Sequence, residues 1–299
     1  MATTSPDAAF DAVAAIEEAK VSFAVLHGEA ALARREVDSD IDVVSDRPVY
    51  ELVRASTQHW AAVGLYPLIV WPYDVGGTGS VFLTTQDAQQ GVQLDFLHDP
   101  SGRGRYGARS DRLLDVPVAG RRFTTVAPGE QMAYLLAKRI GKGDPAGARR
   151  LVEGASSRDI ALDVLRPDIA DVVRSFVENG TTPRGWDRRP APGHFITRLW
   201  RPAGGWVELR GKGSERVATE LTSRFARFLP HARCIASPHF AGWATSVAPV
   251  RWRAGLVASY GPRSRIAPRP DLSIDGPVST DEAAARIVAR LAGRYTHPD

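Results

Sequence analysis

Residues 21–44 read VSFAVLHGEAALARREVDSDIDVV, and this stretch decides which fold the chain is expected to adopt. Its apolar run 23–26 is followed by a polar segment, after which aspartates alternate with aliphatic residues. On a β-strand this alternation places Asp40 and Asp42 on one face, because side chains two residues apart share a face. Two neighbouring carboxylates raise each other's pKa unless a cation such as Mg²⁺ lies between them. By themselves, however, the two aspartates are also typical of a solvated turn, so further ligands are needed to indicate a metal site.

The order of these features resembles the nucleotidyltransferase superfamily, which has the DNA polymerase β-like fold. That family has a strand ending in glycine, a short helix, and an Asp-x-Asp motif on the next strand. Here Gly28 is separated from Asp40 by eleven residues, a gap within the family's usual range. Glu29 stands where the family usually has Gly or Ser, which weakens the expected side-chain contact to phosphate. The backbone turn at Gly28 is retained, since glycine lets the main chain approach an anion closely.

The resemblance also requires a third carboxylate on a later strand, and Asp95 is the candidate. It interrupts the apolar run 92–97, where it lies between Leu94 and Phe96. A carboxylate inside such a run is costly to bury unless something pairs with it. The alternative is an ordinary solvent-facing aspartate on an amphipathic strand. Gly28 at the right distance and Asp95 downstream together favour the metal site, provided that these segments form neighbouring strands.

The resemblance implies Mg²⁺-dependent transfer of a nucleoside monophosphate from a nucleoside triphosphate to a hydroxyl or similar oxygen, with release of pyrophosphate. Two Mg²⁺ ions are implied, with Mn²⁺ as an alternative metal. Asp40 and Asp42 would hold the ion on the triphosphate, and Asp95 would hold the second ion or take the acceptor's proton. The residues expected to contact the nucleotide are Gly28, Arg34, Ser39 and Lys138. Lys138 has a second interpretation, a lysine that interacts with the carboxyl end of the helix expected at 128–142.

The acceptor stays open at this point. A small molecule is favoured by the modest net charge and the compact length, while tRNA or a protein hydroxyl is an alternative. A different class of function is a catalytically inactive binding or scaffold protein, since Glu29 departs from the family's motif. The sequence does not indicate the base of the nucleotide or the oligomeric state.

Composition indicates an ordinary soluble globular protein, expected in the cytoplasm. The 299 residues are 43% apolar and 24% charged, with a net charge of +4 and a pI of about 9.4. A small positive excess can help to hold phosphates or a polyanion. The single cysteine, Cys234, excludes an internal disulfide and fits a reducing compartment. No apolar stretch approaches the length that spans a bilayer, and no secretory signal is visible at the N-terminus.

The pattern of apolar residues predicts an α/β protein. Residues 1–127 are expected to form a nucleotidyltransferase-like domain with a mixed sheet, followed by a helical region at 128–180 and a linker at 181–205. Helices are predicted at 5–20, 29–36, 48–63 and 128–142, and strands at 21–26, 40–44, 65–71, from 81 onward, and around Asp95. In the helix at 128–142, Met132, Leu135 and Leu136 are expected to face the core, and Lys138 to project elsewhere.

Residues 206–299 form the second expected unit. A strand at 206–209, a glycine-rich turn at 211–216, a helix at 217–229, and a final strand and helix within 268–291 resemble a thymidylate-kinase-like P-loop domain. Ser214 stands where that loop has its phosphate-binding lysine, and Glu215 and Arg216 replace its hydroxyl residues. The resemblance therefore implies a degenerate P-loop unit, structural or substrate-binding, without kinase activity. The alternative is an unrelated α/β unit with a glycine-rich turn.

Overall fold

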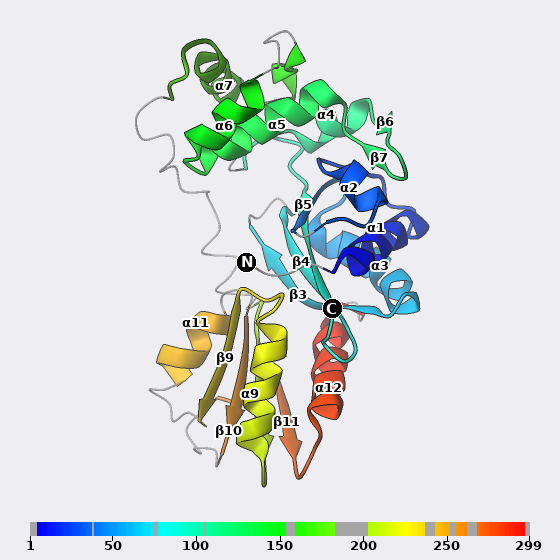
Figure 1. The fold of residues 1–299 in the computed structure, drawn as a ribbon, viewed down its shortest axis with the longest axis vertical. Coiled ribbons are helices and arrows are strands. Elements are labelled where there is room, and N and C mark those ends of the chain that lie inside the picture. Colours follow the sequence, from blue (N-terminus) through cyan, green and yellow to red (C-terminus); the bar gives the residue numbers. More distant parts are fainter. Residues whose placement is uncertain are drawn as a thin grey trace.

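The structure is a computed structural model that describes residues 5–37, 39–73, 77–104, 106–153, 159–182, 203–236, 243–251, 255–261 and 268–296. Within these ranges it contains a mixed sheet of seven strands and a parallel sheet of four, which confirms the α/β class. Figure 1 shows three tiers along the long axis: a helical layer, the mixed sheet with its own helices, and the parallel sheet. No helix in the described part of the chain has the length and apolar character needed to cross a membrane.

The mixed sheet has the strand order β3-β4-β5-β2-β1-β7-β6. Strands β2 and β5 are parallel neighbours, whereas β4 is antiparallel to β5 and β3 is antiparallel to β4. The predicted strand at 40–44 begins one residue later, at Ile41, so Asp40 precedes the strand. The strands are β1 (Phe23–Val25), β2 (Ile41–Ser45), β3 (Leu65–Pro72), β4 (Gly79–Thr85), β5 (Gly91–Leu97), β6 (Val118–Ala119) and β7 (Thr124–Thr125).

One face of this sheet is covered by α1 (Pro6–Glu18) and α3 (Val49–Ala62). Their apolar residues recur at helical spacing and pack on alternate residues of the strands, such as Val43 and Leu94. Trp60 is fully buried there, and its indole Nε1 donates to the carbonyl oxygen of Ala12 at 2.9 Å. The short helix α2 (Glu29–Ala33) follows β1.

The opposite face near β1 and β2 is covered by α4 (Ser110–Asp115), α5 (Pro128–Gly141), α6 (Pro145–Val152), a 3₁₀ turn (Leu162–Val164) and α7 (Pro167–Asn179). Helices α5, α6 and α7 each begin at a proline. Proline suits this position because a backbone N–H in the first helical turn has no acceptor within the helix, so no hydrogen bond is lost. The packed residues of this layer include Leu26, Val44 and Leu97 of the sheet and Leu136 and Ile140 of α5. This layer therefore holds α5 over the carboxyl ends of β2 and β5.

The parallel sheet has the strand order β11-β8-β10-β9. It comprises β8 (Gly205–Arg210), β9 (His231–Ala236), β10 (Gly255–Tyr260) and β11 (Leu272–Asp275). Helix α9 (Ser214–Phe225) begins three residues earlier and ends four residues earlier than predicted. Most of the predicted linker, residues 183–202, lies outside the described part of the chain. The remaining elements are a wide helical turn (Trp243–Val247), α11 (Ala248–Arg251), α12 (Thr280–Ala292) and a 3₁₀ turn (Gly293–Tyr295).

The two sheets share one apolar core. Helix α9 lies along one face of the parallel sheet and packs against α12, which in turn packs on β3. Ile69 and Phe82 of the mixed sheet lie in one apolar cluster with residues of both helices. At Gly91 a Cβ atom would lie 2.4 Å from the ring of Phe228, so glycine is required for this close approach. Near the chain end, the hydroxyl of Tyr295 accepts from the backbone N–H of Val70 at 3.0 Å. The C-terminal unit therefore completes the core of the first sheet.

Candidate active site

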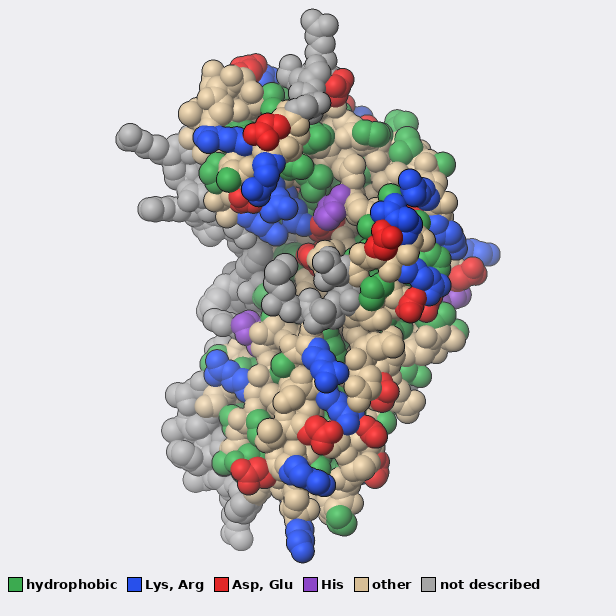
Figure 2. Space-filling model, in the orientation of Figure 1, with side chains coloured by type: hydrophobic (Ala, Val, Ile, Leu, Met, Phe, Trp, Pro, Cys, Tyr) green, Lys and Arg blue, Asp and Glu red, His purple; other side chains and the backbone are tan. Residues whose placement is uncertain are grey.

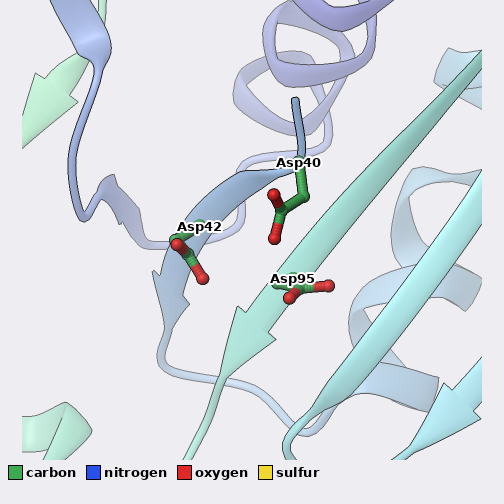
Figure 3. Close-up of side chains that lie close together, drawn as sticks. All are labelled: Asp40, Asp42 and Asp95. Carbon is green, nitrogen blue, oxygen red and sulfur yellow. The ribbon is translucent and has the colours of Figure 1, made fainter. Parts of the chain in front are cut away.

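Three acidic side chains meet at the middle of the mixed sheet. Asp42 on β2 is paired directly with Asp95 on β5 in the sheet register, so both project from the same face. Asp40 lies just before β2. One carboxylate oxygen from each of the three residues lies within 4.8 Å of the others, and Figure 3 shows the three side chains around a common space. The structure thus brings together the three acidic residues that the sequence singled out.

Asp42 is buried and bound by two basic side chains. The ammonium of Lys138 donates to Oδ1 at 2.6 Å and to Oδ2 at 2.5 Å, and Nε2 of His27 lies 2.5 Å from Oδ2. Burial alone would raise the pKa of this carboxyl, but His27 and Lys138 outweigh burial and lower the pKa to about 2. Asp42 is therefore ionised throughout the physiological range.

Asp95 has the opposite electrostatic character. Burial, followed by the negative charges of Asp42 and Asp40, raises its pKa to about 6, although hydrogen bonds from Gln93 and Ser80 oppose the rise. Ser80 Oγ donates to Asp95 Oδ1 at 2.5 Å, and Gln93 Nε2 donates to the same atom at 2.9 Å. Two carboxyls from adjacent strands thus differ in pKa by about four units, which is the pattern expected of groups with different roles.

The donor set fits a hard divalent cation. Carboxylate oxygens are the ligands that Mg²⁺ and Mn²⁺ prefer, and the three residues supply them from one edge of the space in Figure 3. Oxygens within 4.8 Å of one another match the spread of ligands around one ion or around two ions about 3.5–4 Å apart. Asp40, Asp42 and Asp95 would hold such ions.

A cavity of about 360 Å³ opens beside Asp42 and Asp95. Helix α5 contributes Tyr134 and Lys138, and Lys142 follows at its carboxyl end, so that the three residues recur at four-residue spacing and line the cavity. Other walls are formed by aromatic and backbone groups at the ends of β3 and β5 and in the loop after β5. They include Trp71, Tyr73, Thr78, Phe96, Leu97, Asp99, Gly104, Tyr106, Gly107 and Ala108. Basic side chains along one wall and carboxylates at its end suit an anionic ligand that carries metal.

Lys138, which was predicted to lie off the core-facing side of its helix, faces the cavity beside Asp42. Only 12% of its side chain is exposed, and it reaches across the cavity wall to Asp42. Burial alone would lower the pKa of Lys138, but the charge and hydrogen bonds of Asp42, together with the charges of Asp95 and Asp40, outweigh burial and raise it. In the described structure the partner of Lys138 is therefore a carboxylate of the site, while its contact with a nucleotide stays a prediction.

The other predicted contact residues lie in different surroundings. Gly28 precedes α2 with φ +77°, a conformation that side chains other than glycine rarely adopt, and open space lies where a Cβ would be. Ser39 is partly exposed beside Asp40. Arg34 is exposed, pairs with Glu36 at 2.6 Å, and is not among the residues that line the cavity. The structure thus leaves Arg34 without a position at the site.

Glu29 has a role that the sequence comparison with the family did not reveal. Its buried carboxylate accepts hydrogen bonds from the backbone N–H groups of Arg121 at 3.0 Å, Arg122 at 2.7 Å and Phe123 at 3.0 Å. It therefore closes the turn between β6 and β7. Burial alone would raise the pKa of Glu29, but the three backbone hydrogen bonds outweigh burial and lower it.

Glu29→Ala is expected to lower the free energy of unfolding by about 1–3 kcal/mol at pH 7, because three backbone donors lose their acceptor. A carboxyl with a lowered pKa in the folded state stabilises above its ordinary pKa, and this contribution is lost as the pH falls through the folded value. The difference in the free energy of unfolding between Glu29→Ala and the unmodified protein, measured by urea unfolding, should therefore become smaller as the pH falls toward 4. Glu36→Ala is the control, since this exposed residue has a surface ion pair, and an equal loss there would contradict the assignment.

Several residues at the site escaped the sequence analysis. His27, Ser80, Gln93 and Tyr73 contact the acidic residues, yet none belongs to a motif. The contact of Gln93 with Asp95 could have been predicted from the sequence, because Gln93 is two residues from Asp95 and so lies on the same face of the strand. Ser80 was recognisable only through the register of β4 with β5, which places it directly opposite Asp95.

The glycine-rich turn of the second unit has little free space. Gly211 and Gly213 have φ values of +108° and +83°, and α9 begins immediately afterwards at Ser214. Glu215 accepts a hydrogen bond from the hydroxyl of Tyr260 at 3.1 Å. The cavity beside the turn measures about 10 Å³, which is about the volume of one water-sized probe. The turn in this conformation has no room for a nucleotide.

No protein-family model matches the sequence, and no curated protein matches it.

Proposed function

We propose that the protein is a metal-dependent nucleotidyltransferase that moves a nucleoside monophosphate from a nucleoside triphosphate to an oxygen of a small molecule and releases pyrophosphate. The observation that supports this most strongly is the convergence of Asp40, Asp42 and Asp95 at one end of a cavity whose wall carries Lys138 and Lys142. The fold supports it further, since a strand ending at a glycine turn, a short helix and the next strand position the first two acids.

The proposed roles of Asp42 and Asp95 follow from their different electrostatic environments. Asp42 stays ionised and is suited to hold a cation, whereas Asp95, with a pKa of about 6, is suited to accept the acceptor's proton near neutral pH. Lys138 and Lys142 would neutralise the phosphate chain along α5. Bound Mg²⁺ would supply charge stabilisation to the entering and leaving oxygens. The aromatic walls would exclude water and so disfavour hydrolysis of the triphosphate.

A small-molecule acceptor is supported by the size and lining of the cavity. About 360 Å³, lined by five aromatic residues together with charged, aliphatic and glycine residues, is in the usual range for small ligands. Basic and acidic side chains are interspersed over the face shown in Figure 2, whereas a nucleic-acid acceptor would favour a continuous basic band. The single cysteine supports a cytoplasmic location.

The competing proposal is a binding protein without turnover, which is favoured by one observation. Both oxygens of Asp42 are already bound by basic side chains. One experiment distinguishes nucleotidyl transfer from binding without turnover. The full-length protein is incubated with each of the four nucleoside triphosphates, Mg²⁺ and a panel of hydroxyl-bearing small molecules. Acceptor-dependent pyrophosphate release that EDTA abolishes supports transfer. Binding of the Mg²⁺–nucleotide complex without pyrophosphate release across the panel contradicts it.

A further inference from the structure

The hydrogen bonds to Asp95 all fall on one of its two oxygens. Among the described residues, Oδ1 accepts from Ser80 Oγ at 2.5 Å and from Gln93 Nε2 at 2.9 Å, and the hydroxyl oxygen of Tyr73 lies 3.4 Å from it. No residue in the described part of the chain donates to Oδ2. Asp42 differs, since both of its oxygens are bound.

The three donors are fixed by the sheet itself. Ser80 is directly opposite Asp95 in the register of β4 with β5, and it is fully buried. Gln93 lies two residues before Asp95 on the same face of β5 and also reaches Ser80 Oγ, at 3.4 Å. Tyr73 follows β3, and its hydroxyl is hydrogen-bonded to Ser80 Oγ. Three adjacent strands thus contribute one connected network that ends on Oδ1.

The hydrogen bonds to Oδ1 restrict the rotation of the Asp95 carboxylate about its terminal side-chain torsion. The terminal torsion of an aspartate side chain is broad, so a carboxylate without partners samples a wide range of orientations. Ser80 and Gln93 donate to Oδ1, and Tyr73 donates its single hydroxyl proton to Ser80 Oγ and so orients Ser80. Together they hold the plane of the carboxylate, and the orientation of Oδ2 is then determined as well. Supporting hydrogen bonds of this kind tune ligand residues in metal sites.

We propose that Ser80, Gln93 and Tyr73 are positioning residues that engage Oδ1 of Asp95 and thereby present Oδ2 as the oxygen that meets the metal or the acceptor hydroxyl. This inference rests on the proposed nucleotidyltransferase function and deepens it. The rival explanation is that the network only offsets the cost of burying a carboxylate. The two explanations differ in what they predict for turnover and metal affinity.

The central variant is Ser80→Ala in the full-length protein, with Ser56→Ala as its matched control. Ser56 is also fully buried, but its hydroxyl on α3 has no hydrogen-bond partner in the described structure. Ser80→Ala is expected to lower kcat about 10–100-fold and to weaken Mn²⁺ binding, measured by electron paramagnetic resonance, by about tenfold. The KM for the nucleotide should stay within about threefold, because the phosphates contact α5 instead. Ser56→Ala should change neither quantity.

Two further comparisons separate positioning from a purely structural role. The losses should follow the hydrogen-bond lengths, with Ser80→Ala larger than Gln93→Met and Gln93→Met larger than Tyr73→Phe. In an Asp95→Asn background, Ser80→Ala should have no additional effect on kcat or on Mn²⁺ affinity, since its action passes through Asp95.

The outcomes can be told apart. If Ser80→Ala behaves like Ser56→Ala in kcat and Mn²⁺ affinity while Asp95→Asn lowers both by more than about tenfold, the positioning role is overturned and the proposed function stands. If Asp95→Asn retains transfer, the assignment of Asp95 fails and this inference fails with it. The Mn²⁺ titration requires no turnover, so it tests the positioning role even before the acceptor is identified.

Discussion

Asp42→Asn is expected to lower nucleotidyl transfer by at least about 10³-fold, which corresponds to about 4 kcal/mol of lost transition-state stabilisation. The variant removes a buried carboxylate whose lowered pKa keeps it ionised at every pH of interest, and the substitution is nearly isosteric. The amide cannot replace the charge that a divalent ion needs. Initial rates of pyrophosphate release with saturating Mg²⁺ measure the effect, and Asp46→Asn, on the exposed residue after β2, is the control.

The same variant is expected to destabilise the fold, because Lys138 loses its partner. Removing one member of a buried ion pair costs about 3–5 kcal/mol, since the other charge is left uncompensated. The lowered pKa of Asp42 means that its stabilisation is complete above about pH 4 and is lost as the pH falls through about 2. The double variant Asp42→Asn/Lys138→Met should therefore recover much of the stability without recovering transfer. Retained turnover in a well-folded Asp42→Asn protein would rule out the proposed mechanism.

Asp95→Asn is expected to stabilise the metal-free protein by about 2–3 kcal/mol at pH 8. Because the folded-state pKa of Asp95 is about 6, the folded protein binds this proton more tightly than the unfolded chain, whose carboxyl has a pKa of 3.8. The ionised carboxyl therefore opposes folding above pH 6, and this cost fades as the pH falls toward 4. Asparagine is neutral at both values, so the gain over the unmodified protein should shrink below about 1 kcal/mol at pH 4.

Urea unfolding in EDTA at pH 8 and pH 4 measures the effect of Asp95→Asn, and Asp46→Asn again serves as the control. An identical difference at both pH values would show that Asp95 does not carry the raised pKa. The variant should also lose transfer, so stability and activity are expected to move in opposite directions. Such a trade-off is common where a functional site is built from groups that repel one another.

The sequence patterns predicted most of what depends on local periodicity. The alternation at 40–44 indicated that Asp40 and Asp42 share a face, and the α/β class followed from the order of apolar runs. Element boundaries shifted by a few residues, as for α9, because helix starts depend on turn geometry at Gly213. These features are encoded by neighbours in the chain, which is why they could be anticipated.

The features that escaped prediction depend on residues far apart in the chain. Lys138 was predicted to contact a nucleotide, but its pairing with Asp42, which is 96 residues away in the chain, was not predicted. Glu29 was compared with a phosphate-binding motif, but its partners are 92 to 94 residues away in the β6–β7 turn. Ser80 became visible only once the register of two strands was known. Tertiary pairing, rather than propensity, decided these positions.

The core shared by the two sheets constrains how the chain can be cut for laboratory work. Leu68, Ile69 and Phe82 are completely buried in the full chain, under helices that come after residue 213. A truncated product that ends at residue 180 would expose this apolar patch to water, and contiguous patches of this kind promote aggregation. Recombinant production of the N-terminal part by itself should therefore yield insoluble material, even though every acidic residue of the candidate site lies in that part.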